Sequence, residues 1–305
     1  MTQPDMTLID DALLREWSLP MPSDEGDKEE RGRLLVIGGS RQMPGAIILA
    51  ATAAMRAGAG KLAIATGASV AQLVALAIPE SRVIGLPETG DGGIDASAAK
   101  ALASMRGRLD AVLIGPGMQD EPAICEFVHA LLPMLDGVRV VLDAAAMGLV
   151  CDAGADGGAG FLGRYGADVL LTPHAGEMAH LSGASKDEVS ADPAPMALRM
   201  ARHWQATVAL KGPTTFIATP EGQAWKHEGG NVGLAASGSG DTLAGIIVGL
   251  AARGATLAQA GAWGVALHAR AGDALARRSG PLGYLTRDLA AEVPMLMHRL
   301  GTGQA

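Results

Sequence analysis

Arg33-Leu34-Leu35-Val36-Ile37-Gly38-Gly39-Ser40 decides the fold class, because an almost wholly apolar run ends there in a glycine-rich turn. Residues 46–57 then have the composition of a helix that stops at Gly58, and residues 61–66 that of a second strand. Strands that are apolar throughout, rather than alternating, are typical of a parallel sheet that helices cover on both faces. The stretch therefore predicts a layered α/β protein.

The same rhythm of strand, turn and helix recurs along the chain. Further apolar runs that end at a polar or glycine-rich turn cover residues 111–114, 138–142, 169–171 and 207–210. Beyond Gly222 the pattern changes, and helices are expected over residues 243–254, 257–276 and 287–300. We therefore expect a mostly parallel central sheet followed by a helix-rich C-terminal third.

The chain has no composition break or long linker beyond its first 32 residues. Residues 1–32 are polar and predict a short helix over 10–17 followed by a surface link, and the Gly/Ala-rich stretch 153–160 predicts a loop. Residues 33–300 are expected to form one domain.

Bulk composition narrows the function classes. The net charge of −8 and the lack of a Lys/Arg block argue against nucleic acid as a partner. The first residues are acidic, and no uncharged apolar run reaches spanning length, so we expect a cytoplasmic protein without membrane contact. The two cysteines, Cys125 and Cys151, lack metal-site spacing and are expected to be buried thiols.

The strongest chemical signal is the turn Gly238-Ser239-Gly240-Asp241, which precedes the apolar run from Leu243. Backbone amides of Gly238, Ser239 and Gly240, together with the positive end of the following helix, would form an anion hole. Asp241 has two interpretations: it caps the helix or tightens the turn, or it is a general base that deprotonates a hydroxyl attacking phosphorus. The turn alone does not decide between them.

A second polar turn follows the strand at 207–210 and comprises Lys211-Gly212-Pro213-Thr214-Thr215. Lys211 is either an exposed loop lysine or a phosphate contact. Other phosphate motifs fail, because Gly60-Lys61 lacks the upstream glycine of a P-loop and Gly38-Gly39-Ser40 is not G-x-G-x-x-G.

Taken together, the ordered motifs resemble those of the ADP-dependent NAD(P)H-hydrate dehydratases, a branch of the ribokinase-like superfamily. The similarity extends over nearly the whole chain. Its motifs are Arg31-Gly32-Arg33, Gly38-Gly39-Ser40, Gly45-Ala46, Ala57-Gly58-Ala59-Gly60, Gly115-Pro116-Gly117, Thr172-Pro173-His174, Gly176-Glu177-Met178, Leu210-Lys211-Gly212, Gly238 to Asp241, Gly283-Tyr284-Leu285 and Asp288-Leu289.

The resemblance implies a ribokinase-like three-layer sandwich and a repair reaction. Such enzymes phosphorylate the hydroxyl of hydrated NADH or NADPH at the expense of ADP, with magnesium as the bridging ion. Loss of phosphate then restores NAD(P)H and leaves AMP. It further implies a homo-oligomer, a tetramer by family resemblance. The usual epimerase partner domain is not expected in this chain.

Carried over position by position, the resemblance implies two groups of contacts. Ala46, Gly117, His174 and Asp241 would line the hydrate site, with Asp241 as the base. The adenine nucleotide would be held by Lys211, Gly212, Pro213, Thr214, Thr215 and Gly240. His174 is otherwise a plain turn residue, and Glu177 is interpreted as a helix-start acid rather than a catalyst.

Three positions depart from the family's pattern. Ala145 stands where a second aspartate follows Asp143, Gly148 replaces an asparagine, and Ser237 replaces the first glycine of the anion-hole turn. These departures keep open a ribokinase-like kinase of a small alcohol or vitamin precursor, or a catalytically impaired nucleotide-binding relative.

Overall fold

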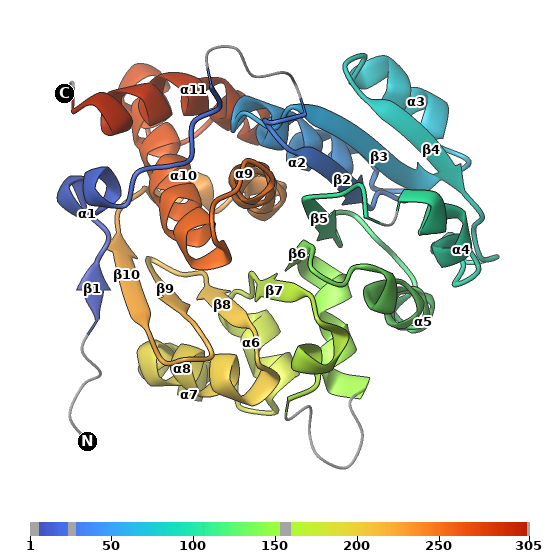
Figure 1. Cartoon of the computed structure of the whole chain (residues 1–305). Helices are drawn as coiled ribbons and strands as arrows, with labels where there is room; N and C mark the ends of the chain where they lie inside the picture. Colours follow the sequence, from blue (N-terminus) through green and yellow to red (C-terminus); the bar gives the residue numbers. More distant parts are fainter. Residues whose placement is uncertain (1–5, 24–28, 106, 153–159, 304–305) are drawn as a thin grey trace.

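The chain folds around one sheet in a computed structural model that describes residues 6–23, 29–105, 107–152 and 160–303. The strands are β1 Thr7–Leu8, β2 Arg33–Ile37, β3 Lys61–Gly67, β4 Arg82–Leu86, β5 Ala111–Ile114, β6 Arg139–Leu142, β7 Asp168–Leu171, β8 Thr207–Leu210, β9 Thr214–Ala218 and β10 Ala224–Glu228. They lie in the order β1-β10-β9-β8-β7-β6-β5-β2-β3-β4 (Figure 1).

Most of the sheet is parallel. Strands β2 to β8 pair in parallel, whereas β9 runs antiparallel to both β8 and β10. Because parallel strands share one direction, the turns that follow β2, β5, β6, β7 and β8 meet at the same edge. This carboxyl edge is where the polar turns predicted from the sequence come together.

Helices cover both faces of the sheet, which confirms the predicted three-layer α/β sandwich (Figure 1). On one face lie α1 Asp11–Glu16, α2 Pro44–Arg56, α3 Ala71–Ala77, α9 Ser239–Ala252, α10 Leu257–Ser279 and α11 Thr286–Thr302. On the other lie α4 Ala98–Leu102, α5 Glu121–Leu131, the 3-10 segment η3 Ala144–Asp152, α6 Ala175–Ser182, α7 Lys186–Ala191 and α8 Pro193–Trp204. Shorter 3-10 turns are η1 Ala103–Met105, η2 Leu132–Met134, η5 Leu162–Tyr165 and η6 Val232–Leu234.

The alternation of side chains explains why the strands are apolar throughout. In β2, Leu34 and Val36 enter the core under α2 and α9, while Leu35 and Ile37 enter the core under α5. Successive strand residues point to opposite faces, so a sheet buried on both sides needs apolar residues at every position.

The apolar strands and long helices were predicted close to their observed bounds. Strands β1, β4, β9 and β10 were missed. Of these, β10 carries Lys226, His227 and Glu228, and polar residues are the norm near a sheet edge. The C-terminal third is helix-rich as predicted, with β10 as an additional strand. The loop expected at 153–160 falls largely outside the described residues.

The N-terminal segment packs onto the domain. Helix α1 matches the predicted helix, and β1 pairs in parallel with β10. Trp17 stacks on Trp225 with 5.3 Å between ring centroids, and its carbonyl accepts a hydrogen bond from Trp263 Nε1 at 2.8 Å. Among the described helices, none is long and apolar enough to cross a membrane.

Candidate active site at the carboxyl edge of the sheet

Three neighbouring strands deliver a compact polar cluster. Asp143 follows β6, His174 follows β7 through Thr172-Pro173, and Lys211 follows β8. The backbone holds the last two turns together, because Lys211 N donates to Pro173 O at 2.7 Å. The cluster thus rests on the rigid middle of the sheet.

Lys211 lies among carboxylates. Its Nζ is 3.4 Å from Asp143 Oδ1 and 3.7 Å from Glu177 Oε2, and its side chain is 17% exposed. Burial by itself would lower the pKa of Lys211, but the charges of Asp143, Glu177 and Asp241 outweigh it and raise the pKa. The lysine is therefore a fixed cation, and its interpretation as an exposed loop lysine is wrong.

A hydrogen bond from Thr172 holds the Asp143 carboxylate in place. The Thr172 hydroxyl lies 2.5 Å from Asp143 Oδ1 and 3.3 Å from Leu142 O, and both residues are buried. Asp143 Oδ1 consequently contacts a hydroxyl and an ammonium at once. A buried carboxylate held in this way is a positioned charge rather than a mobile surface acid.

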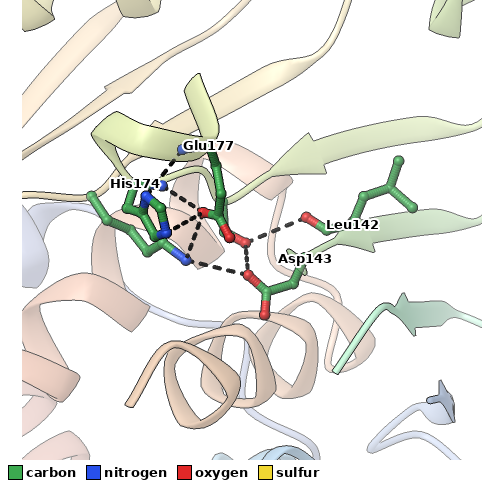
Figure 2. Close-up of polar contacts among 6 residues, drawn as sticks. Leu142, Asp143, His174 and Glu177 are labelled. Carbon is green, nitrogen blue, oxygen red and sulfur yellow. Dashed lines mark hydrogen bonds and ion pairs between the residues drawn. The ribbon is translucent and has the colours of Figure 1, made fainter. Parts of the chain in front are cut away.

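His174 and Glu177 begin α6 as a reciprocal capping box (Figure 2). The Glu177 amide donates to His174 Nδ1 at 3.0 Å, and the His174 amide donates to Glu177 Oε2 at 2.8 Å. This confirms Glu177 as a helix-start acid, and its contact with Lys211 gives it a second role. With Nδ1 accepting a hydrogen bond, the exposed ring of His174 carries Nε2 as its remaining polar atom.

The predicted anion-binding turn is the first turn of α9. Gly238 is the N-cap residue with φ +86°, and no side chain caps this helix. The helix begins at Ser239, four residues before the expected start, so Gly240 and Asp241 lie within its first turn. Asp241 is therefore not the N-cap residue but an acid in the first turn of α9, where a negative charge interacts favourably with the helix dipole.

The amides of this turn are not equivalent. Ser239 N donates to Ala236 O at 3.1 Å and so belongs to the turn's own hydrogen bonding. The amides of Gly240 and Asp241 lie at helix positions that have no intrahelical acceptor. A Cβ at Gly240 would lie 3.3 Å from Lys211 Nζ, so the start of α9 and the ammonium lie close together. Backbone amides at a helix start beside an ammonium suit a phosphate group.

Asp241 has a strongly perturbed carboxyl group. Burial and the nearby charge of Asp143 raise the pKa of Asp241 from 3.8 to about 6, against the opposing charge of Lys211. A carboxylate in this range is still ionised at neutral pH and is a better proton acceptor than an ordinary aspartate.

His268 holds the first turn of α9 through Ser239. The sequence analysis did not identify this histidine as part of the site. Its Nε2 lies 3.0 Å from Ser239 Oγ, and burial lowers the pKa of His268 to about 4, so the ring is neutral. The two residues are 29 positions apart on different helices, α9 and α10. Sequence spacing therefore carries no signal for this pair.

Ala46 and Gly117 lie side by side at the carboxyl edge of the sheet. Gly117 has φ +67°, and a Cβ there would come within 2.8 Å of Ala46 Cβ, so only glycine fits. Ala46 is in the first turn of α2, and Leu49 on the same helix would be 2.5 Å from a Cβ at Gly238. The starts of α2 and α9 are thus adjacent.

The expected nucleotide loop is shorter than predicted. Gly212 and Pro213 form an exposed turn, but Thr214 and Thr215 begin β9 and Thr215 is buried. Their different burial follows from the pairing of β8 with β9, which the sequence analysis did not predict.

Two of the three departures line a cavity beside the cluster. Ala145 and Gly148 lie on η3 and line a hollow of about 880 Å³ between α5, η3 and α6, which His174 and Glu177 also line. Both cysteines also line this hollow. Cys151 is exposed and Cys125 is half-buried, so the expected burial of the two thiols is wrong. Ser237 is exposed, and its carbonyl accepts a hydrogen bond from Thr286 Oγ1 at 2.9 Å.

No ready metal cage exists within the described residues, since no three His, Cys, Asp or Glu side chains converge as ligands. Asp143, Glu177 and Asp241 nevertheless surround one lysine, which leaves net negative charge and hard oxygen donors at the edge. This donor set fits Mg²⁺, which is commonly held by one or two carboxylates together with substrate phosphates.

Comparison with known proteins identifies similar proteins of one family. A family model described as NAD(P)H-hydrate dehydratase matches residues 34–295. The chain is 47% identical over 303 residues to the ADP-dependent (S)-NAD(P)H-hydrate dehydratase of Xanthomonas campestris pv. campestris, covering 99% of this chain and all of that protein.

Solved structures agree. The ADP/ATP-dependent NAD(P)H-hydrate dehydratase of Bacillus subtilis, co-crystallised with ATP/Mg²⁺, superposes with a TM-score of 0.82 at 29% identity, covering 98% of this chain and 99% of that one. A ribokinase-like superfamily protein of Enterococcus faecalis gives a TM-score of 0.78 at 26% identity, covering 97% of this chain and 96% of that one.

Proposed function

The chain belongs to the NAD(P)H-hydrate dehydratase family, and on that premise we propose how its own residues carry the reaction. The activity is the ADP-dependent conversion of (S)-NAD(P)H hydrate to NAD(P)H. The hydrate hydroxyl is phosphorylated by ADP, which leaves AMP, and phosphate is then eliminated. Hydroxide is a poor leaving group and phosphate a good one, so phosphorylation makes the dehydration feasible.

The observation that carries the assignment of roles is the meeting of Asp241, Lys211 and the uncapped start of α9. In our proposal the amides of Gly240 and Asp241, with Lys211, hold the phosphates of the adenine nucleotide. Gly212 and Pro213 would contact the edge of the adenine nucleotide, and Thr214 and Thr215 would contact it through their backbone atoms. Gly238 and Ser239 shape the turn, and His268 holds Ser239 in place.

Asp241 is the proposed base. It removes the proton from the hydrate hydroxyl as the oxygen attacks the transferring phosphoryl group, and the preorganised amides and Lys211 stabilise the charge on that group. Ala46, Gly117 and His174 are the proposed contacts to the hydrate ring. Mg²⁺ would be held by Asp143 or Glu177 together with phosphate oxygens, and it would neutralise phosphate charge.

One variant tests the assignment of the base. Asp241→Asn keeps the size of the side chain but is a very poor base, so we expect turnover of hydrated NADH to be lost while ADP binding survives. The measurement is recovery of reduced-nicotinamide absorbance with ADP and Mg²⁺, and ADP affinity by calorimetry. Turnover close to wild type in the variant would exclude Asp241 as the base.

The ribokinase-like kinase alternative predicts a different product. If wild type leaves hydrated NADH unchanged but converts a small alcohol to a stable phosphate ester, the dehydratase assignment falls. Both products can be followed in one experiment by ³¹P NMR.

We also propose that the protein is cytoplasmic and a homo-oligomer, a tetramer by family resemblance. Light scattering on a sizing column measures the oligomeric state, and a monomer mass would overturn this part.

A further inference from the structure

The N-terminal segment contacts the sheet through a buried histidine. Strand β1 lies beside β10 at one end of the sheet, and β10 pairs with β9 on its other side (Figure 1). His227 on β10 is 6% exposed, and its Nδ1 lies 3.1 Å from the carbonyl oxygen of Ile9. Ile9 is also buried, and its amide donates to Lys226 O at 2.8 Å. The proposed reaction does not use this contact.

The contact with Ile9 fixes the position of the proton on the neutral imidazole. A carbonyl oxygen can only accept a hydrogen bond, so Nδ1 of His227 carries the hydrogen and Nε2 carries the lone pair. Nε2 is buried and has no hydrogen-bond partner among the described residues. A second proton on this ring would therefore place a charged N–H group where no described acceptor receives it, which is unfavourable in a buried site.

The charged groups around His227 do not supply that acceptor. They line a small cavity together with His227 and come from the start of α1, from β10 and from α10: Asp10, Asp11, Glu228, Arg270 and Asp273. Each of the four carboxylates already accepts a hydrogen bond or an ion pair from another group. Burial lowers the pKa of His227, and the charge of Arg270 acts in the same direction, whereas the contact with Ile9 and the charges of Asp273 and Glu228 oppose this shift.

A second anchor holds the segment farther along the chain. The carbonyl oxygen of Trp17 accepts hydrogen bonds from Trp263 Nε1 at 2.8 Å and from Gln259 Nε2 at 3.1 Å. An indole and an amide do not change their protonation between about pH 5 and pH 8, whereas an imidazole does. Of the two anchors, the one at His227 is therefore the one that responds to pH in this range.

We propose that residues 7–16 form an acid-sensitive latch, which protonation of His227 releases from the domain while the chain stays anchored at Trp17. Release brings Nε2 into contact with water and uncovers Leu14, which is fully buried in the docked segment. The rest of the sheet keeps its order, because β10 remains paired with β9. The inference does not depend on the proposed function, since the latch lies outside the cluster around Lys211.

Proton linkage gives the direction of the effect. In the released state His227 lies on an exposed edge strand and has its ordinary pKa of 6.5, whereas the docked state binds the proton less tightly. Docking is therefore strongest at about pH 7.5 and above, and it weakens as the pH falls through 6.5. For a single proton, the docking equilibrium constant can fall by at most about tenfold between pH 7.5 and pH 5.5.

Hydrogen exchange of the intact chain without nucleotide, followed by mass spectrometry, tests the latch. After correction for the intrinsic pH dependence of exchange, we expect the protection of residues 7–16 to fall about three- to tenfold between pH 7.5 and pH 5.5. The central strand β5 is the internal reference and should not lose protection in parallel. Unchanged protection of residues 7–16, or an equal loss in β5, would overturn the latch.

Two substitutions identify the sensor. His227→Asn keeps an N–H donor near the position of Nδ1 but does not titrate, so the pH dependence of protection in residues 7–16 should disappear. His298→Asn is the matched control, because His298 lies exposed on α11, and it should leave the pH dependence as in wild type. A pH dependence that persists in His227→Asn would rule out His227 as the sensor.

A third substitution tests the neighbouring ion pair, and it decides the question even if His227→Asn does not fold. Asp11→Asn removes the ion pair with Arg270 and should lower the protection of residues 7–16 at both pH values. The ratio between the two pH values should stay as in wild type, because His227 is still present. Loss of the pH dependence in Asp11→Asn would assign the sensing to the ion pair and overturn the role of His227.

Discussion

Replacement of Asp241 by asparagine should stabilise the fold while it abolishes turnover. The pKa of Asp241 is raised from 3.8 to about 6, mainly by burial and by the charge of Asp143. Each pKa unit corresponds to about 1.4 kcal/mol, so ionisation of this carboxyl group opposes folding by about 3 kcal/mol at pH above 7. Asparagine has nearly the same shape and no charge, and therefore avoids this penalty.

The pH dependence fixes the sign of the effect. The folded state binds the Asp241 proton more tightly than the unfolded state, so wild type regains stability as pH falls through about 6. The advantage of Asp241→Asn should be about 1–3 kcal/mol near pH 8 and should shrink toward zero near pH 4. Loss of the attraction to Lys211 is already contained in the raised pKa.

Urea denaturation of both proteins at several pH values, without nucleotide, measures the difference. Asp241→Glu is the control, since it keeps the charge and should not show the stabilisation. A variant less stable than wild type at pH 8, or an advantage that does not change between pH 8 and pH 4, would refute the argument that a destabilising charge is stored at this position.

Three further variants test other parts of the site. Lys211→Ala should weaken ADP binding by about 10- to 100-fold in calorimetry, more than hydrate binding, because a charge-assisted contact to phosphate is lost; the reverse order would mean that the two sites are exchanged. Ala145→Asp should leave hydrate turnover intact or raise it and should steepen its Mg²⁺ dependence, and loss of turnover would contradict the view that Ala145 marks a tuned site. Gly115→Ala should lower the unfolding free energy by about 2–4 kcal/mol, because φ is +130° and a Cβ would lie 1.8 Å from Asp143 O; an unchanged thermal midpoint would show that this turn relaxes easily.

The sequence predicted the fold where one physical signal dominates. The strands buried on both faces are apolar throughout, so β2, β5 and β8 were found at their observed bounds. The strands β9 and β10 form a hairpin near one edge of the sheet, and β10 ends in Lys226, His227 and Glu228 rather than in an apolar run. Their pairing with β8 and β1 depends on contacts far apart in sequence.

The candidate site was predicted in its glycine turns and its charged residues but not in its supporting contacts. Lys211 and Asp241 could be chosen because their turns have distinctive composition. Their electrostatic setting could not, because the proximity of Asp143, Glu177 and Lys211 arises only when three strands align. His268 was similarly hidden, since a single histidine on an apolar helix face has no spacing that points to Ser239.

The pairing of β1 with β10 has a consequence for how the chain folds during synthesis. The carbonyl of Ile9 meets His227 Nδ1 across 218 residues of sequence. At a ribosomal rate of about 5–20 residues per second, Ile9 waits on the order of 10–40 s before its partner strand is made. Throughout that interval Leu14 and Trp17 lack the surface that later covers them. The earliest part of the chain to be made is therefore among the last to reach its native place, and it is the segment that a chaperone acting on the nascent chain would meet exposed.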